Sequence, residues 1–162
     1  YRSYFLSHAA FVVRSVAAGE ATTTTAPNNS PSTNIINPGK ILGTFYVKPN
    51  FPGRCSHVCN GGFITDPQFR SIGVGRLMGS SFLALARDLQ YKSAYFNLVF
   101  KSNPVSIRLW ESLGFTRVAT IPNAARLEGV EGLDDAYGYY FDLTGLPDDF
   151  DPVDYAEKPA NC

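Results

Sequence analysis

The chain has 162 residues, of which 44% are hydrophobic and 17% charged, and this size and balance fit one globular domain with a core of its own. Its 14 lysines and arginines equal its 14 aspartates and glutamates. No overall field therefore attracts polyanions, which argues against a nucleic-acid binder that relies on phosphate contacts. No stretch approaches the ~20 apolar residues that a membrane-spanning helix needs, and no signal peptide is visible.

The chain contains three cysteines, Cys55, Cys59 and Cys162. An odd number, with one at the very end, does not predict a disulfide framework, so we expect a reducing, cytoplasmic setting, with the mitochondrion as the alternative. The sequence begins at Tyr1 and not at Met, so we expect further residues to precede it. In an extended stretch Cys55 and Cys59 lie about 13 Å apart at ~3.3 Å per residue. That separation is too large for a shared zinc ion, and we expect no metal site.

The first third of the chain predicts strands around a long insertion. Residues 4–9 have helical character, and residues 10–15 are rich in the β-branched and aromatic residues that favour a strand. Residues 19–38 are rich in Thr, Asn, Ser and Pro, which cannot supply a packed face, so they predict a mobile loop between two strands. The next strand is predicted at residues 41–47.

A further strand is predicted at residues 56–65, interrupted by Gly61 and Gly62. Two glycines inside a strand indicate either a bulge or a close approach to the backbone. Apolar residues then recur at three- and four-residue spacing over residues 74–89. This spacing predicts an amphipathic helix.

The second half continues the alternation of strands and helices. Residues 95–100 form a short apolar run, typical of a strand that is buried on both faces. Asn103 and Pro104 predict the N-cap and first position of a helix that Gly114 ends. The remaining elements are two strands and a solvated tail rich in Asp and Pro, at residues 116–121, 137–143 and 146–162.

From residue 40 onward the predicted order is strand, strand, helix, strand, helix, strand, strand. This order indicates an α/β fold with a mixed sheet and at least one parallel crossover. We expect one domain over residues 1–162. A fold class of this kind implies no chemistry by itself.

The segment Arg70-Ser71-Ile72-Gly73-Val74-Gly75 lies between the strand predicted at residues 56–65 and the amphipathic helix. A helix N-terminus presents unpaired N–H groups and the positive end of the helix dipole, and glycines let an anion approach. Arg70 and Arg76 flank the loop and can add charge-assisted hydrogen bonds to a pyrophosphate. The alternative is that the glycines only tighten a turn. A dinucleotide fingerprint is not met, because Met78 stands where its third glycine belongs.

Two segments of the chain resemble the markers of one enzyme family. Arg70-x-x-Gly73-x-Gly75 resembles the Q/R-x-x-G-x-G/A acetyl-CoA signature of the GNAT superfamily of N-acetyltransferases. Residues 103–115, from Asn-Pro to Gly-Phe, resemble the superfamily's second marker, N-x-x-A-x-x-x-Y-x-x-x-G-F. The two markers together, in the correct order, are more specific than either alone. The resemblance covers about residues 40–143 and implies a GNAT fold, a mixed and mostly antiparallel sheet of six to seven strands flanked by helices.

A narrower resemblance concerns residues 43–57, GTFYVKPNFPGRCSH, and residues 96–100, FNLVF. Both are similar to the fungal L-azetidine-2-carboxylate N-acetyltransferases, which detoxify proline analogues. This similarity implies transfer of the acetyl group of acetyl-CoA directly to the amine of a small amino acid, such as a proline analogue or a proline-related metabolite. No acyl-enzyme is implied.

The resemblance also implies which residues bind acetyl-CoA. Phe63, Ile64 and Thr65 would lie beside the pantetheine arm, and a main-chain N–H near Ile64 would polarise the thioester carbonyl. The loop would hold the pyrophosphate, and the start of the second helix would contact the pantetheine or phosphate region. These loop and helix residues are Arg70, Ser71, Ile72, Gly73, Val74, Gly75, Arg76, Asn103 and Ser106.

The acid and base of many relatives have no counterpart here. The stretch 56–65 contains no Glu, and Trp110 stands where relatives carry a Tyr. Asn60 and Asn97 match places where asparagines position the substrate in the proline-analogue enzymes, so they are the candidate catalytic residues. An Asn amide orients a substrate but cannot accept a proton, so catalysis would depend on proximity. His57 is the alternative general base, and a structural hydrogen bond is the alternative role of Asn97.

Other functions fit the same sequence. A protein or peptide N-acetyltransferase is one, and a non-catalytic acyl-CoA-binding sensor domain is another, favoured by the missing Glu and Tyr. A plain nucleotide binder is a third. Small GNAT domains often pair, and exposed strand edges offer a route to a homodimer. We expect a small amine and acetyl-CoA as partners, with no nucleic acid and no membrane.

Overall fold

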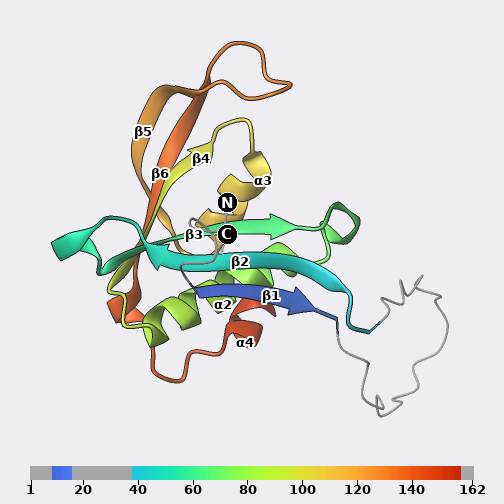
Figure 1. Ribbon diagram of the computed structural model, residues 1–162, viewed down its shortest axis with the longest axis vertical. Coiled ribbons are helices and arrows are strands. Elements are labelled where there is room, and N and C mark those ends of the chain that lie inside the picture. The colour runs from blue at the N-terminus through green and yellow to red at the C-terminus, as the bar shows by residue number, and fades with distance from the viewer. Residues whose placement is uncertain (1–8, 16–37, 158–162) are drawn as a thin grey trace.

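The computed structural model describes residues 9–15 and 38–157, which form one six-stranded sheet with helices (Figure 1). Short 3₁₀ turns carry the label η. In chain order the described elements are β1 (Ala9–Arg14), β2 (Ile41–Pro49), η1 (Gly53–Cys55), β3 (Val58–Thr65), η2 (Pro67–Phe69), α2 (Val74–Asp88), β4 (Ser93–Phe100), α3 (Pro104–Ser112), β5 (Thr116–Ala125), β6 (Asp134–Asp142), η3 (Leu143–Gly145) and α4 (Pro152–Glu157).

The sheet has the strand order β1-β2-β3-β4-β6-β5. All neighbouring strands are antiparallel except β3 and β4, which are parallel and joined by the crossover through α2. This is the mixed, mostly antiparallel α/β sheet that the sequence predicts. β3 and β4 pair only at Val58–Ser93 and Cys59–Ala94. Beyond these pairs the strands separate, and the two halves of the sheet run in clearly different directions (Figure 1).

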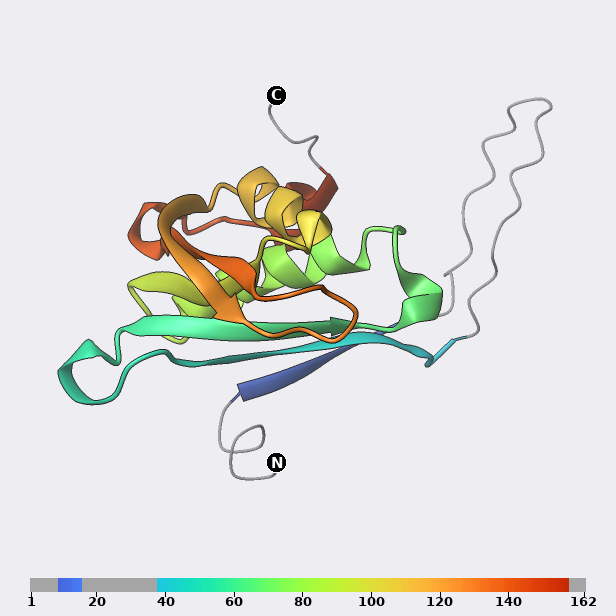
Figure 2. The same ribbon diagram turned by 90° about the horizontal axis from the view of Figure 1, so that it is seen from above.

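The core lies between the sheet and its helices, because α2, α3 and α4 all cover the same side of β1–β3 (Figure 2). Alternate residues of β2 point to this side, so Phe45 and Val47 are buried. From α2 they meet Met78 and Phe82, which are fully buried. Burying a ring such as Phe82 contributes about 2–3 kcal/mol to stability.

The two glycines of β3 make room for aromatic rings. A Cβ at Gly61 would lie 2.6 Å from the ring of Phe82, and a Cβ at Gly62 would collide with the ring of Tyr46. The β2–β3 register is unbroken along its length. Of the two predicted readings, close approach to the backbone is therefore confirmed and a bulge is wrong.

The predicted start and end of α3 are confirmed, and a glycine also marks the start of α2. Gly73 precedes α2 with φ +92°, and Gly114 follows α3 with φ +85°, both in the left-handed region that favours glycine. The side-chain oxygen of Asn103 accepts a hydrogen bond from the Ser106 N–H at 3.1 Å, as an N-cap does. The predicted helix at residues 4–9 and loop at residues 19–38 lie almost wholly outside the described residues.

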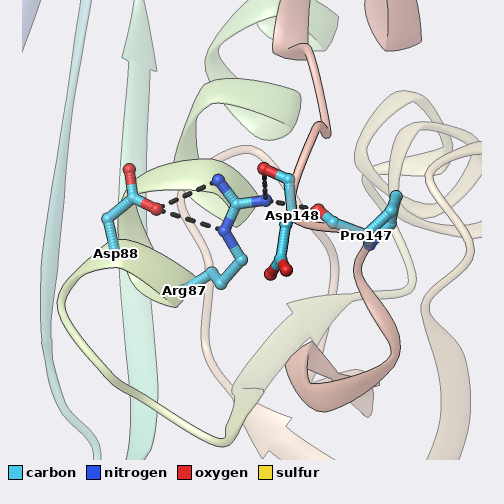
Figure 3. A network of polar contacts seen from close by, with 4 residues as sticks. All are labelled: Arg87, Asp88, Pro147 and Asp148. Carbon is cyan, nitrogen blue, oxygen red and sulfur yellow. Dashed lines mark hydrogen bonds and ion pairs between the residues drawn. The ribbon is translucent and has the colours of Figure 1, made fainter.

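The C-terminal segment differs from the predicted solvated tail, because α4 packs on α2. The ring centroids of Phe150 and Tyr155 lie 4.9 Å apart. The Tyr155 hydroxyl donates to the Leu113 carbonyl at 3.2 Å. Arg87 of α2 donates to the carbonyl oxygen of Pro147 at 2.5 Å and forms an ion pair with Asp88 (Figure 3). The aspartates of this segment are exposed. The aromatic residues between them dock the helix, and a prediction based on charge alone missed this.

Among residues 9–15 and 38–157, no helix is long and apolar enough to span a membrane.

Candidate active site

A cavity of about 360 Å³ occupies the gap where β3 and β4 separate. Three elements supply most of its wall. From β3 come Asn60, Gly61, Gly62 and Phe63, and from β4 come Phe96, Asn97, Leu98, Val99 and Phe100. The third element is α3 with its N-cap, which supplies Asn103, Ser106 and Trp110. Tyr46 of β2 completes the lining. The predicted Asn60, Phe63, Asn97, Asn103 and Ser106 thus meet at one site.

Three asparagines form a connected cluster beside this cavity. Asn50 and Asn97 bind each other through both amide atoms, with Asn50 Nδ2 donating to Asn97 Oδ1 at 3.0 Å and Asn97 Nδ2 donating to Asn50 Oδ1 at 2.6 Å. Asn60 Nδ2 donates to the same Asn50 oxygen at 3.0 Å. Within the described part of the chain, the Asn60 side-chain oxygen has no protein donor. It is the atom that can accept a hydrogen bond from an amine.

Asn50 is not among the candidate residues that the sequence predicts. It follows β2 directly, and its N–H donates to the Val58 carbonyl at 2.8 Å, so the β2–β3 ladder extends through it. The usable signal was its place in the same antiparallel hairpin as Asn60. Two asparagines ten residues apart across a predicted turn can share one face of a sheet.

The position of Asn97 depends on an irregularity in β4. The register with β6 shifts between Phe96 and Val99, which leaves Asn97 half-buried at the cavity and Leu98 50% exposed. The prediction that this strand is buried on both faces is therefore wrong over these two residues. A bulge of this kind re-aims a side chain and is common next to functional sites.

The back wall of the cavity is aromatic. Trp110 is 5% exposed. The centroid of its ring lies 4.6 Å from the ring centroid of Phe96 and 4.8 Å from that of Phe63. An indole N–H can donate a hydrogen bond, but it is far too weak an acid to protonate a departing thiolate. Of the described residues that line the cavity, Tyr46 alone carries an ionisable side chain, and sequence reasoning did not select it.

The remaining nucleophile and base candidates lie apart from the cavity lining. His57 is exposed, and its Nδ1 lies 3.2 Å from the Arg54 carbonyl oxygen. Burial raises the pKa of the fully buried Cys59 thiol to about 12, so the thiol is protonated near neutral pH. No group of three or more potential metal ligands occurs in the part of the chain that the structure describes.

The glycine loop forms an open cradle at the N-terminus of α2. Ser71 and Gly73 have positive φ angles of 62° and 92°, and nothing lies within 4 Å of a Cβ built at Gly73. Arg70, Ser71 and Ile72 are exposed. An anion can therefore reach the first N–H groups of the helix, which also carry the positive end of its dipole. A Cβ at Gly75 would lie 3.6 Å from the Leu109 side chain, which is an ordinary van der Waals contact, so α2 lies beside α3 at this point.

Arg76 corrects one expectation. Its guanidinium donates to the Ala156 carbonyl at 2.8 Å, to the Tyr155 carbonyl at 3.4 Å and to Ser112 Oγ at 2.7 Å. The side chain therefore ties α2 to α4 and α3 and does not face the loop. The physical reason is helical geometry, since the first turn already rotates this side chain away from the loop. Only its backbone N–H remains a candidate for phosphate binding.

The backbone of β3 offers hydrogen bonds to the gap at every second residue. The Asp66 N–H donates to the Leu42 carbonyl at 3.0 Å. Because bonded and non-bonded pairs alternate in an antiparallel ladder, Ile64 also directs its N–H toward β2. The N–H groups of Phe63 and Thr65 point the other way, into the gap. The donor expected near Ile64 is thus the Phe63 N–H, one residue earlier.

Comparisons with known proteins agree with this geometry. The acetyltransferase (GNAT) family model matches residues 12–115. N-acetyltransferase aca1 of Schizosaccharomyces pombe is 53% identical over 108 residues, which cover 67% of this chain and 52% of that protein. The chain thus spans about half the length of this relative.

Solved structures show the same fold. A GCN5-related N-acetyltransferase from Kribbella flavida is 30% identical, with a TM-score of 0.61 over 64% of this chain and 61% of that chain. The protein yncA from Salmonella typhimurium, solved with its cofactor acetyl-CoA, is 22% identical, with a TM-score of 0.58 over 64% of this chain and 58% of that chain. The family model matches most of the chain, and the separated strands β3 and β4 and the open glycine loop agree with it. The chain therefore belongs to the GNAT acetyltransferase family.

Proposed function

We propose that this chain is an acetyl-CoA-dependent N-acetyltransferase that acetylates the amine of a small amino acid. The observation that carries the proposal is the amide-lined cavity, which lies in the gap between β3 and β4 and extends to the start of α3. The glycine loop packs on the same helix through Gly75 and Leu109. A donor site and an acceptor site therefore adjoin. The names of the S. pombe relative and of the Salmonella structure support acetyl-CoA as the co-substrate.

The residues present fit acetyl-CoA. The open cradle at Gly73 and the N-terminus of α2 suit a pyrophosphate. The N–H and carbonyl groups that Phe63 and Thr65 direct into the gap suit a pantetheine arm. When bound, acetyl-CoA supplies an activated acetyl thioester. The Phe63 N–H then polarises the thioester carbonyl and stabilises the charge that develops on its oxygen.

The asparagines orient the amine. Asn60 accepts a hydrogen bond from the amine nitrogen, and the Asn50–Asn97 pair holds the wall rigid. The amine nitrogen forms its bond to the acetyl carbon as the carbon–sulfur bond breaks, and the sulfur leaves as a thiolate that takes up a proton. No carboxylate or imidazole lines the described cavity, so the proton of the amine passes to water. Proximity and orientation supply most of the rate enhancement.

The acceptor class that we favour is a cyclic secondary amino acid such as L-azetidine-2-carboxylate. The similarity of residues 43–57 and 96–100 to the enzymes that acetylate this compound supports the choice. A cavity of about 360 Å³ suits a small substrate. The test follows thiol release from acetyl-CoA with this acceptor, for the wild type, Asn60→Ala and Asn97→Ala. We expect turnover in the wild type and a loss of about 100-fold in both variants.

Gln68→Ala is the matched control, since it removes an exposed amide from η2, outside the cavity. Acetyl-CoA binding is measured on the same samples. Binding that survives while turnover falls supports the positioning role of the asparagines. Equal loss in Gln68→Ala, or full activity without either asparagine, contradicts it.

A second candidate is a non-catalytic acyl-CoA sensor. The observation in its favour is that the described cavity lining contains no carboxylate and no imidazole, and that Trp110 replaces a possible acid. Acetyl-CoA binding without thiol release, over a panel of amines and peptides, would select this function. Turnover above background with any amine excludes it.

We also propose that the chain forms a homodimer. β1 and β5 are the edge strands of the sheet, and β5 is long and mostly exposed. Unpaired N–H and carbonyl groups on such an edge can pair with a second copy. Sedimentation equilibrium at micromolar concentration should give twice the mass of one chain, and a mass of one chain refutes the proposal.

A further inference from the structure

The cavity that we assign to the acceptor has a cation beside it that the function described so far does not use. Lys48 lies on β2, directly across the ladder from Asn60. Lys48 and Tyr46 are two residues apart on one strand, so both side chains lie on the same face of the sheet. This is also the face of Asn60, since directly opposed residues of a ladder share a face.

The Lys48 side chain turns along β2 toward the ring of Tyr46. Its ammonium nitrogen lies 5.4 Å from the centroid of the Tyr46 ring, and Tyr46 lines the cavity. The ring in turn lies against Gly62, where no side chain could stand between strand and ring. The lysine is half-buried, and its position beside the ring is that of a cation–π contact.

Within the described part of the chain, the residues that line the cavity carry no formal charge, so Lys48 is a nearby group that can offer a positive charge to a substrate. The described residues that line the cavity include no Lys, Arg, His, Asp or Glu. A free amino acid brings a carboxylate as well as an amine, and a carboxylate in a partly desolvated site needs a donor or a cation. Asn60 serves the amine nitrogen, Asn50 and Asn97 bind each other, and none of the three amides supplies a positive charge.

We propose that Lys48 binds the carboxylate of the acceptor and so determines that this site takes amino acids in preference to amines without a carboxylate. The inference rests on the proposed function, since it assigns a role within the same acceptor site. Bound in this way, the carboxylate lies on the Lys48 side of the cavity and the amine lies toward Asn60.

The test compares acceptors that differ only in the carboxylate. L-azetidine-2-carboxylate, its neutral carboxamide and azetidine are assayed with the full chain as wild type, Lys48→Met and Lys48→Arg. Met keeps the apolar stem and removes the charge, whereas Arg restores the charge. We expect Lys48→Met to raise the KM of the carboxylate acceptor about tenfold, with kcat and both neutral acceptors little changed. We expect Lys48→Arg to recover most of the loss.

Lys40→Met is the matched control. The Lys40 ammonium also lies over an aromatic ring, that of Phe69 at 5.3 Å, but this ring does not line the cavity. Its removal should leave all three KM values unchanged. An equal rise for charged and neutral acceptors in Lys48→Met, or no rise for either, overturns the role of Lys48.

Binding separates this inference from the proposed function. Calorimetric titration of L-azetidine-2-carboxylate into the protein with CoA present needs no turnover. Binding that Lys48→Met weakens about tenfold, in a chain that acetylates no amine, supports the lysine site and refutes the transferase. Turnover with equal binding by both proteins supports the transferase and refutes the lysine site. Neither binding nor turnover refutes both.

Discussion

The two strands that border the cavity contribute to it in opposite ways. β3 keeps an unbroken register with β2, and so it presents backbone N–H groups to the gap at every second residue. β4 loses its register with β6 between Phe96 and Val99, and so it presents the side chain of Asn97. A regular strand offers a ladder for an extended ligand, whereas an irregular strand can aim one polar group. The proposed donor and acceptor sites follow this division.

The largest expected effect concerns Asn50, which joins the two sides of the gap. Asn50→Ala removes the partner of both Asn60 and Asn97 and leaves their amides without the contacts that orient them. We expect kcat/KM for the acceptor to fall about 100-fold, as misplaced positioning groups cost rates of this order. Steady-state thiol release measures it.

Acetyl-CoA binding, followed by calorimetry, provides the control for Asn50→Ala, since β3 and the glycine loop are untouched. An unchanged kcat/KM would show that Asn50 does not orient the other two asparagines.

The regularity of β3 can be broken at Gly61. Gly61→Ala places a Cβ against the ring of Phe82, which is fully buried and cannot move freely. Overpacking of this kind should lower the free energy of unfolding by about 2 kcal/mol in urea titration. Gly145→Ala is the matched control, because nothing lies within 4 Å of a Cβ there, and it should stay within about 0.5 kcal/mol of the wild type. Equal stability of the two variants would contradict the packing argument.

Substitution of Arg76 tests whether the backbone or the side chains of the glycine loop bind the cofactor. Arg76→Met removes the bonds to Tyr155, Ala156 and Ser112, so the free energy of unfolding should fall by about 1.5 kcal/mol. The dissociation constant of CoA should change less than twofold, because the backbone N–H is kept. Unchanged stability together with a tenfold weaker CoA complex would show that the side chain binds phosphate after all.

Stability should also depend on pH through Cys59, which lies where the two halves of the sheet part. Its pKa is raised by burial to about 12 in the folded chain, above the unfolded value near 9. Its contribution to stability is therefore complete below about pH 9 and is lost as the pH rises toward 12, at up to about 1.4 kcal/mol per pH unit. Urea titrations between pH 8 and 11 measure the slope. Cys59→Ala should reduce that slope, and an identical slope in both proteins would contradict the assignment.

Much of the fold could be predicted because its signals are local. The apolar period over residues 74–89, the Asn103–Pro104 start and the Gly114 end depend on neighbours in sequence, and each is confirmed. The two family markers placed the glycine loop correctly between strand and helix. The docking of α4 could not be predicted in this way, because it depends on contacts between Tyr155 and Leu113, far apart in the chain.

The same contrast between local signals and contacts of distant residues applies to the candidate site. Residue identity alone shows that residues 56–65 contain no Glu and that position 110 carries a Trp, and the prediction of positioning asparagines starts from these identities. Only the folded chain brings Asn50 to Asn60 and Asn97 and places the Lys48 ammonium over the ring of Tyr46. These contacts depend on the register of the strands in the sheet. Which residues meet across a sheet is set by strand pairing and by one bulge, and neither is encoded in any single stretch of the chain.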